Sequence, residues 1–364
     1  VDNTAPTMTI TAANSAGTAV STGFTTNDTT LALTFTASEA ASTFTLDDIA
    51  VNGGTLSSLS ATSTTVYTAT FTPTGDGAVT IDVAASTFTD DAGNDNTAAT
   101  QFNWTYNGTV PTISSVSLAS NNATIAVTMS EAVYNTNSGS GALEVADFGF
   151  TISGGSATLS SATPTSISAS GNVYTLGIGL SGTPTGAETL TVNPTDNGIY
   201  DVVGNEASTS QSSNTASLND QAVPTVTITA AAGGSAVSSG ATTNSSTLTL
   251  TFTTSEATTN FGIGDVTVSG GSLSSFSGSG TTYTATFTPS ASGATTVDIA
   301  ANKFTDGASN DNTAASQFAW TYDGTAPTMA ITAAAGGSAV SSGATTNNAT
   351  LALTFTSSEA TTNF

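Results

Sequence analysis

One sequence motif recurs along this chain at intervals of roughly one hundred residues. The segment VDNTAPTMTITAA at residues 1–13 returns as DQAVPTVTITAAA at 220–232 and as DGTAPTMAITAAA at 323–335, and a diverged copy, NGTVPTISSVSLA, begins at Asn107. An interval of roughly one hundred residues between copies is the size of one ordinary domain with its own core. The 364 residues are therefore interpreted as an array of similar domains, and the fold can be predicted from one unit.

The repeat predicts three complete domains and part of a fourth. The expected boundaries are residues 1–107, 108–219, 220–323 and 324–364, and the second domain is the most diverged. The fourth copy stops before the segments that would close its core in the other units. We therefore expect these residues to be a stretch of a longer protein, or a chain whose last domain is completed by a neighbour.

Alternation of apolar residues with threonine or alanine predicts β-strands throughout each unit. In the first unit it appears in TTLALTFT at 29–36, TVYTATFT at 65–72, GAVTIDV at 77–83 and QFNWTY at 101–106. A period of two with β-branched residues is typical of half-buried strands, and no helical periodicity is present. About seven short antiparallel strands per unit, separated by turns such as NGGT and PTGDG, predict an all-β chain of tandem immunoglobulin-like β-sandwich domains.

Ionisable side chains are scarce and almost all acidic. The chain has 25 Asp and Glu residues, one basic side chain (Lys303), no His and no Cys, which gives a net charge of −24. Such a surface repels phosphate backbones, so nucleic-acid binding is not expected. The absence of cysteine excludes disulfides and thiolate zinc sites. No apolar run approaches the ~20 residues of a membrane span.

Acidic residues recur at three places in the complete units: before the first strand (where the second unit has Asn107), in a Ser–Glu–Ala segment after the second, and between the last two strands. Immunoglobulin topology brings these three places to the same end of a domain. Clustered like charges repel unless a cation lies among them, and oxygen ligands without nitrogen or sulfur suit calcium better than magnesium. The predicted calcium-binding residues are Asp2, Glu39, Asp90, Asn94, Asp95, Glu131, Asp201, Asn205, Glu206, Asp220, Glu256, Asp306, Asn310, Asp311, Asp323 and Glu359.

The alternative interpretation of these residues is that they are solvated loop acids beside turn-forming Asn and Gly. It describes isolated or outward-facing acids well, namely Asp28, Asp76, Asp82, Asp196 and Asp298. It describes the recurring set poorly, because that set returns in every complete unit. Three further acids recur near the third strand and could either bind a metal or cap a turn: Asp48, Asp147 and Asp265.

Three motifs together resemble the bacterial Ig-like repeat family of large extracellular proteins, which includes repetitive adhesins. They are an opening like TAPTMTIT, a middle F-x-x-x-D-I-x-V-x-x-G-x-L followed by YTATFTP, and a closing F-T-D-x-A-G-N. The resemblance covers essentially the whole chain, with departures at Ser309, where a glycine is usual, and at Asn107, where an aspartate is usual. It implies extracellular extender domains that are often stiffened by calcium, but fold resemblance alone does not transmit a ligand.

The sequence favours a non-enzymatic structural role, as a calcium-stiffened rod of Ig-like domains in a secreted or cell-surface protein such as an adhesin stalk. One alternative is a subunit of a self-assembling filament, sheath or surface layer, in which β-strand addition joins chains. Another is a glycan- or protein-binding module, although Trp104 and Trp320 fall on the apolar phase of their strands and are expected in the core. No histidine or carboxylate pair in an aromatic cleft indicates an enzyme. The expected partners are neighbouring repeats or like chains, with surface glycans or proteins bound through regions outside these residues.

Overall fold

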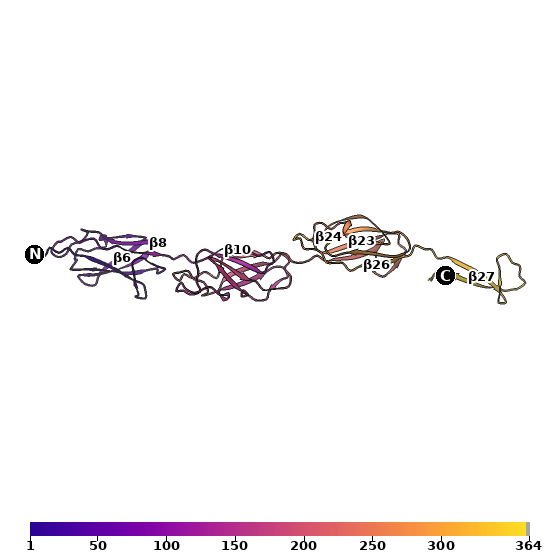
Figure 1. Ribbon diagram of the computed structural model, residues 1–364, viewed down its shortest axis with the longest axis horizontal. Helices are drawn as coiled ribbons and strands as arrows, with labels where there is room; N and C mark the ends of the chain where they lie inside the picture. The colour runs from indigo at the N-terminus through magenta and orange to yellow at the C-terminus, as the bar shows by residue number, and fades with distance from the viewer. Residues whose placement is uncertain (362–364) are drawn as a thin grey trace. The chain divides into compact units, whose positions relative to one another are not determined.

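A computed structural model describes residues 1–361; residues 362–364, the end of the predicted fourth domain, lie outside the described part. The chain divides into two compact units, Val1–Gln221 and Ala222–Phe364 (Figure 1). Three separate apolar cores are present. One spans Met8 to Trp104, the second Ile113 to Leu218 and the third Val226 to Trp320, so each falls inside one predicted complete domain.

Domain 1 is a sandwich of two sheets, with strand orders β2-β1-β4-β7-β6 and β3-β9-β8-β5. The inward residues of β4 are buried and alternate with more exposed ones, as the period of two predicts. The all-β immunoglobulin-like prediction is therefore confirmed. The elements are β1 (Met8–Ala13), β2 (Ala19–Val20), β3 (Phe24–Thr26), β4 (Leu31–Ala37), η1 (Leu46–Asp48), β5 (Ile49–Asn52), β6 (Gly54–Ala61), β7 (Val66–Pro73), β8 (Gly77–Val83) and β9 (Phe102–Tyr106).

One edge of the sandwich differs from the predicted antiparallel arrangement. Strand β3 pairs with β9 in parallel, with Phe24 opposite Trp104. The chain turns after β1 at Asn14, whose Oδ1 accepts the backbone N–H groups of Ala16 and Thr18. It then crosses to the second sheet near Gly23, which has a φ of +79°. The opening segment therefore contributes a strand to each sheet and covers an edge of the second one.

Domain 3 repeats this plan, with sheets β20-β19-β22-β24 and β21-β26-β25-β23, and β21 again runs parallel to β26. Its elements are β19 (Val226–Ala232), β20 (Ser235–Val237), β21 (Thr242–Thr243), β22 (Leu248–Thr258), η3 (Ile263–Asp265), β23 (Val266–Ser269), β24 (Gly271–Pro289), β25 (Gly293–Ile299) and β26 (Phe318–Tyr322). The two predicted core tryptophans are buried: Trp104 packs edge to face on Phe71 and Trp320 on Phe287.

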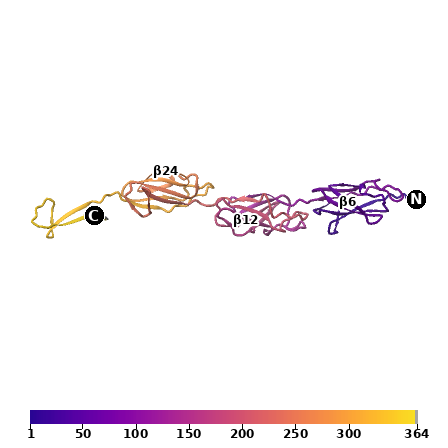
Figure 2. The same ribbon diagram turned by 180° about the vertical axis from the view of Figure 1, so that it is seen from behind.

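Domain 2 has the sheets β10-β11-β15-β14 and β12-β17-β18 and a two-stranded β13-β16 ribbon. Figure 2 shows this domain, labelled at β12, from behind. Its elements are β10 (Ile113–Leu118), β11 (Thr124–Met129), η2 (Val145–Asp147), β12 (Phe148–Ser153), β13 (Thr158–Leu159), β14 (Ile167–Ser170), β15 (Val173–Gly177), β16 (Leu180–Ser181), β17 (Thr189–Pro194) and β18 (Thr215–Ser217).

A fully buried carboxylate, Glu188, precedes β17 in domain 2. Strand register places it where domain 1 has Val79. Its Oε1 accepts the backbone N–H groups of Ser156 and Ala157, and its Oε2 accepts that of Thr185. Burial by itself raises the pKa of Glu188, but these backbone hydrogen bonds outweigh it and lower the pKa to about 2.

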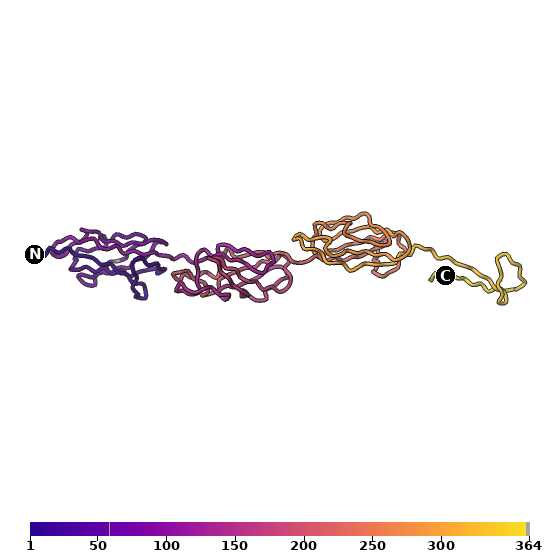
Figure 3. Tube along the Cα trace, in the orientation of Figure 1, coloured from indigo at the N-terminus to yellow at the C-terminus, as the bar shows by residue number. Residues whose placement is uncertain are grey.

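Residues 324–361 form a three-stranded sheet, β28-β27-β29, that appears as a narrow yellow hairpin in Figure 3. Its strands are β27 (Met329–Ala335), β28 (Ser338–Val340) and β29 (Ala352–Ser357). Ile331 is 62% exposed and Leu353 54%, whereas the equivalent Ile10 and Leu33 of domain 1 are buried. No helix within residues 1–361 has the length and apolarity needed to cross a membrane.

Candidate metal centre

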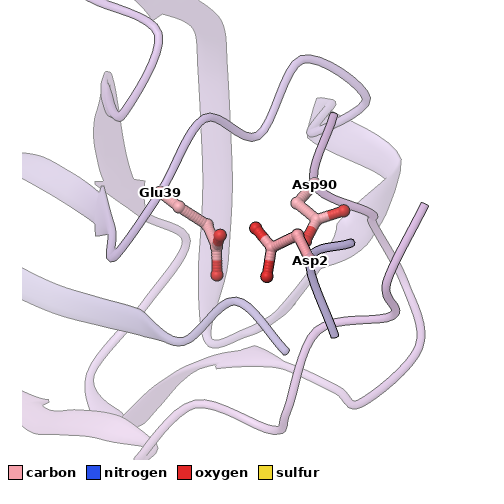
Figure 4. Close-up of side chains that lie close together, drawn as sticks. All are labelled: Asp2, Glu39 and Asp90. Carbon is pink, nitrogen blue, oxygen red and sulfur yellow. The ribbon is translucent and has the colours of Figure 1, made fainter. Parts of the chain in front are cut away.

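Three carboxylates from distant parts of the sequence meet at one end of domain 1, and we call them the pole of domain 1. Asp2 precedes β1, Glu39 follows β4, and Asp90 lies between β8 and β9. Each offers a carboxylate oxygen, and these oxygens lie within 4.8 Å of one another. Figure 4 shows the three side chains side by side. The predicted convergence of these loops is therefore present in the structure.

Asp90 is held by its own loop. Its Oδ1 accepts the backbone N–H groups of Ala92 and Asn94, and its Oδ2 accepts Asn94 Nδ2 at 2.7 Å. Asn94 Nδ2 also donates to the backbone oxygen of Asp2 at 3.3 Å. A carboxylate oxygen can accept two hydrogen bonds. Oδ2 of Asp90 thus keeps a position at which it can bind a cation.

The electrostatics of this pole favour a positive charge. Burial, followed by the negative charges of Asp2 and Asp90, raises the pKa of Glu39. The only basic side chain of the protein, Lys303, belongs to domain 3. A hard cation with oxygen ligands would remove the repulsion, and calcium accepts the mixed carboxylate and carbonyl oxygens present here.

The equivalent loops of domain 3 hold Glu256 and Asp306, whose carboxylate oxygens also lie within 4.8 Å. Asp306 has the same turn: its Oδ1 accepts the N–H groups of Ala308 and Asn310, and its Oδ2 accepts Asn310 Nδ2. Asp220, the sequence equivalent of Asp2, lies at the end of the first compact unit, beside Gly186.

The hydrogen bonding differs at the pole of domain 2, which is formed by Asn107, Glu131 and Asp201. Asp201 repeats the turn with Val203 and Asn205. Its Oδ2 in addition accepts Asn107 Nδ2 at 3.0 Å, so the position that is open on Asp90 is filled here by an amide. Burial, followed by the charge of Asp201, raises the pKa of Glu131. This pole holds two carboxylates and a neutral donor.

The remaining predicted ligands are placed as follows. Asp95 and Asp311 are exposed at the ends of their loops. Glu206 accepts the backbone N–H of Asn197 at 2.6 Å. Asp323 accepts the N–H of Thr325, and the backbone N–H of Glu359 donates to Ser357. Their binding of metal stays a prediction.

The three acids near the third strand cap turns. Asp48 Oδ2 accepts the backbone N–H of Thr45, Asp147 that of Glu144, and Asp265 that of Gly262. Each closes the one-turn 3₁₀ helix that leads into the following strand. Of the two roles that the sequence left open, the structure shows the capping role.

Asp76 is exposed, as its interpretation as a solvated loop acid expects, but it also accepts two specific hydrogen bonds. Its Oδ1 accepts the N–H of Gly108 at 2.7 Å and its Oδ2 accepts the hydroxyl of Thr109, both in the linker to domain 2. These bonds, that of Thr109 first, lower the pKa of Asp76. Ser292 binds Gly324 in the same way after domain 3. The sequence signal was a polar residue in the turns PTGDG (73–77) and PSASG (289–293), which lead into β8 and β25.

Fold and site together define a protein of tandem immunoglobulin-like domains with carboxylate clusters at the domain ends. A family model for the bacterial Ig-like domain matches residues 2–106 and 220–322. These matches cover more than half of the chain, and the protein belongs to the bacterial Ig-like domain family. The resemblance predicted from the motifs is confirmed. Domain 2 lies outside both matches.

Several solved structures are similar to this chain. InvD of Yersinia pseudotuberculosis is 14% identical, with a TM-score of 0.31 over 87% of this chain and 98% of that one. Invasin, a bacterial integrin-binding protein, is 14% identical, with a TM-score of 0.33 over 92% and 64%. The Bacteroides ovatus protein SGBP-B, solved with a mixed-linkage heptasaccharide, is 11% identical, with a TM-score of 0.17 over 83% and 65%. No curated protein matches the chain.

Proposed function

We propose that these residues are a non-enzymatic extender segment of an extracellular, adhesin-type surface protein, stiffened by calcium at the ends of its Ig-like domains. Membership of the bacterial Ig-like family supports the structural role. The observation that carries the calcium assignment is the meeting of Asp2, Glu39 and Asp90, whose oxygens lie within 4.8 Å in a protein with one basic side chain. Glu256 and Asp306 form the equivalent pair of carboxylates in domain 3.

Each residue has a distinct role in the proposed site of domain 1. The hydrogen bonds of its turn hold the Asp90 carboxylate in place, and Oδ2 can accept a cation beside its one hydrogen bond. Glu39 offers a carboxylate whose pKa is raised by burial and then by the negative charges of Asp2 and Asp90. Asp2 comes from the segment that enters the domain, so a bound ion would tie that segment to two loops. Calcium would therefore limit the motion of each domain on the residues before it.

Thermal melting of the whole chain in excess calcium and in excess chelator tests this function. An ion that binds only the folded state raises the melting temperature by mass action. The matched variants are Asp2→Asn and Glu39→Gln, which remove charge with little change in volume and should abolish the calcium response of domain 1. Scattering in the same two buffers measures whether calcium changes the average length.

Equal melting temperatures with calcium and chelator, together with equal scattering profiles, would show that the poles are solvated acids. Magnesium at the same concentration is the control for ionic strength. A shift that magnesium reproduces would contradict the assignment to calcium, because calcium tolerates a flexible shell of six to eight oxygens and magnesium does not.

The filament subunit is the second candidate, and the exposed apolar face of residues 324–361 favours it. Ile331 and Leu353 lie on strands whose counterparts in domain 1 are covered. In domain 1 the edge of β4 pairs with β7, whose sequence is VYTATFTP. A strand of that pattern from another chain would pair with β29 in the same register.

Light scattering over a range of concentrations tests the filament. Assembly that grows with concentration, and that Ile331→Thr and Leu353→Thr suppress, supports it. A mass that stays at 35.5 kDa at every concentration contradicts it.

A further inference from the structure

A pocket of about 790 Å³ opens in domain 1 beside the hairpin that joins β6 to β7. Its lining includes Phe44, Leu46, Leu59 and Tyr67 together with the exposed Asp91. The rings of Phe44 and Tyr67 are buried and meet edge to face, with centroids 5.1 Å apart. Leu46 is exposed and Leu59 is half-buried. The pocket therefore joins a fixed aromatic wall to aliphatic side chains that a partner can reach.

In domain 3 a side chain of the protein itself occupies the equivalent place. The ring of Phe276 stacks on Tyr283, with centroids 5.8 Å apart and planes 26° apart. It also meets Phe261 edge to face at 5.5 Å. A phenyl ring thus fits against this pair of aromatic residues in favourable geometry. The aligned residues of domains 1 and 3 are Leu59 and Phe276, Phe44 and Phe261, and Tyr67 and Tyr283.

Three differences between the domains open this pocket and charge it. Leu59 stands in place of Phe276, and the hairpin of domain 1 is one residue longer. Asp91 stands in place of Gly307, and Ser42 Oγ donates to its Oδ1 at 2.8 Å, which fixes the carboxylate beside the opening. Burial, and then the negative charge of Asp91, raise the pKa of the Tyr67 hydroxyl. Because Asp91 lines the pocket, its carboxylate can act on a bound group.

We propose that the pocket of domain 1 binds an aromatic side chain of a partner protein that carries a positive charge next to the ring. The ring takes the place that Phe276 takes in domain 3, and the charge pairs with Asp91. The net charge of −24 favours cationic partners and repels anionic ones. Burial of the ring contributes most of the binding free energy. The Asp91 carboxylate favours a positive over a negative charge next to the ring.

Saturation-transfer NMR on the whole chain, at a fixed calcium concentration, tests this proposal with three peptides: acetyl-Phe-Lys-amide, acetyl-Phe-Glu-amide and acetyl-Ala-Lys-amide. The Phe-Lys peptide should give saturable transfer, strongest at its ring protons. The Phe-Glu peptide should bind more weakly and the Ala-Lys peptide should show no saturable transfer. Equal transfer to all three peptides, or none to any of them, overturns the proposal.

Variants taken from domain 3 make the test specific. Leu59→Phe fills the pocket as Phe276 does, so it should abolish binding while it raises or preserves the melting temperature. Asp91→Gly should leave ring binding in place and reduce the preference for Lys over Glu about two- to fivefold, as expected for one exposed ion pair. Unchanged binding in Leu59→Phe, or unchanged preference in Asp91→Gly, contradicts the proposal.

The reciprocal variant tests the same site in a second place. Phe276→Leu opens the pocket of domain 3, where Gly307 offers no carboxylate. Placed in the Leu59→Phe background, it should restore ring binding without a preference between the Lys and Glu peptides. Absence of restored binding in a folded double variant would show that Phe261 and Tyr283, the equivalents of Phe44 and Tyr67, do not form a ring-binding wall, and it would contradict the proposal.

Discussion

Domains 1 and 2 share the order of their main strands, but the carboxylates of the two domains have different hydrogen-bond donors. In domain 1, Asp2, Glu39 and Asp90 lie together, and Oδ2 of Asp90 keeps an open position. In domain 2 the amide of Asn107 fills that position on Asp201, and backbone amides surround Glu188. The difference between Asp2 and Asn107 therefore separates a pole of three carboxylates from a pole in which an amide donates to the buried carboxylate.

The largest expected effect concerns Glu188, which replaces the Val79 of domain 1. Glu188→Val should restore an apolar side chain yet destabilise domain 2 by about 3 kcal/mol, because three backbone N–H groups lose their acceptor, that of Ala157 in a buried place. Urea unfolding of the whole chain measures it. Thr295→Val, at the equivalent position of domain 3, removes one hydrogen bond to Trp320 and should cost about 1 kcal/mol. Equal costs for the two variants would refute this account.

The same residue predicts a difference in acid stability between the two domains. The pKa of Glu188 falls from its usual 4.5 to about 2 on folding. A lowered pKa stabilises the folded state above the unfolded pKa, and this contribution is lost as the pH falls from about 4.5 to about 2. Calorimetry over this range should show the transition of domain 2 moving to lower temperature. Glu188→Gln should flatten that dependence; a profile that it leaves unchanged would assign the effect to other groups.

Exchanging one residue between the poles should exchange their response to calcium. Asn107→Asp gives domain 2 a third carboxylate and should create a calcium-dependent rise in its melting temperature, while Asp2→Asn should remove that rise from domain 1. For calcium at about one hundred times its Kd the expected rise is about 10 °C. Asn107→Ala, which removes the amide without adding charge, is the control. A calcium response that the exchange leaves in place would contradict the role given to this residue.

The smallest expected effect lies in the linker between these domains. Asp76→Ala removes the acceptor of the Gly108 N–H and the Thr109 hydroxyl. Amide hydrogen exchange at Gly108 should become faster, with the cores of both domains unchanged. Asp76→Asn retains an acceptor oxygen and should retain part of the protection. Equal exchange in all three proteins would show that the bonds from Asp76 do not restrain the linker.

The strands were predictable because their pattern is local. Leu31, Leu33 and Phe35 alternate with short polar residues, and that period needs no knowledge of the partner strand. The meeting of Asp2, Glu39 and Asp90 was also predictable, because topology assigns their loops to one end of the sandwich. In both cases a simple geometric rule connects residue order to position in space.

Other features depend on side-chain directions that no pattern fixes. The departure at Asn107 was visible in the sequence, but its donation to Asp201 follows from the path of the linker. Glu188 is buried because the residues near Gly154 and Gly155 fold over it. The parallel pairing of β3 depends on a crossing three residues long, which is too short to carry a periodic signal.

The bond between Asp76 and Gly108 has a consequence for the chemical lifetime of the protein. Asn107 is followed by glycine, which has no side chain to hinder attack of its backbone nitrogen on the asparagine side-chain carbonyl. That attack releases ammonia and forms a cyclic imide, which water opens to a carboxylate. The attacking nitrogen belongs to Gly108, and its N–H is held by Asp76 at 2.7 Å. Because the linker must rearrange before that nitrogen can reach the side-chain carbon of Asn107, we expect the hydrogen bond from Gly108 to Asp76 to slow the conversion of Asn107 to aspartate or isoaspartate.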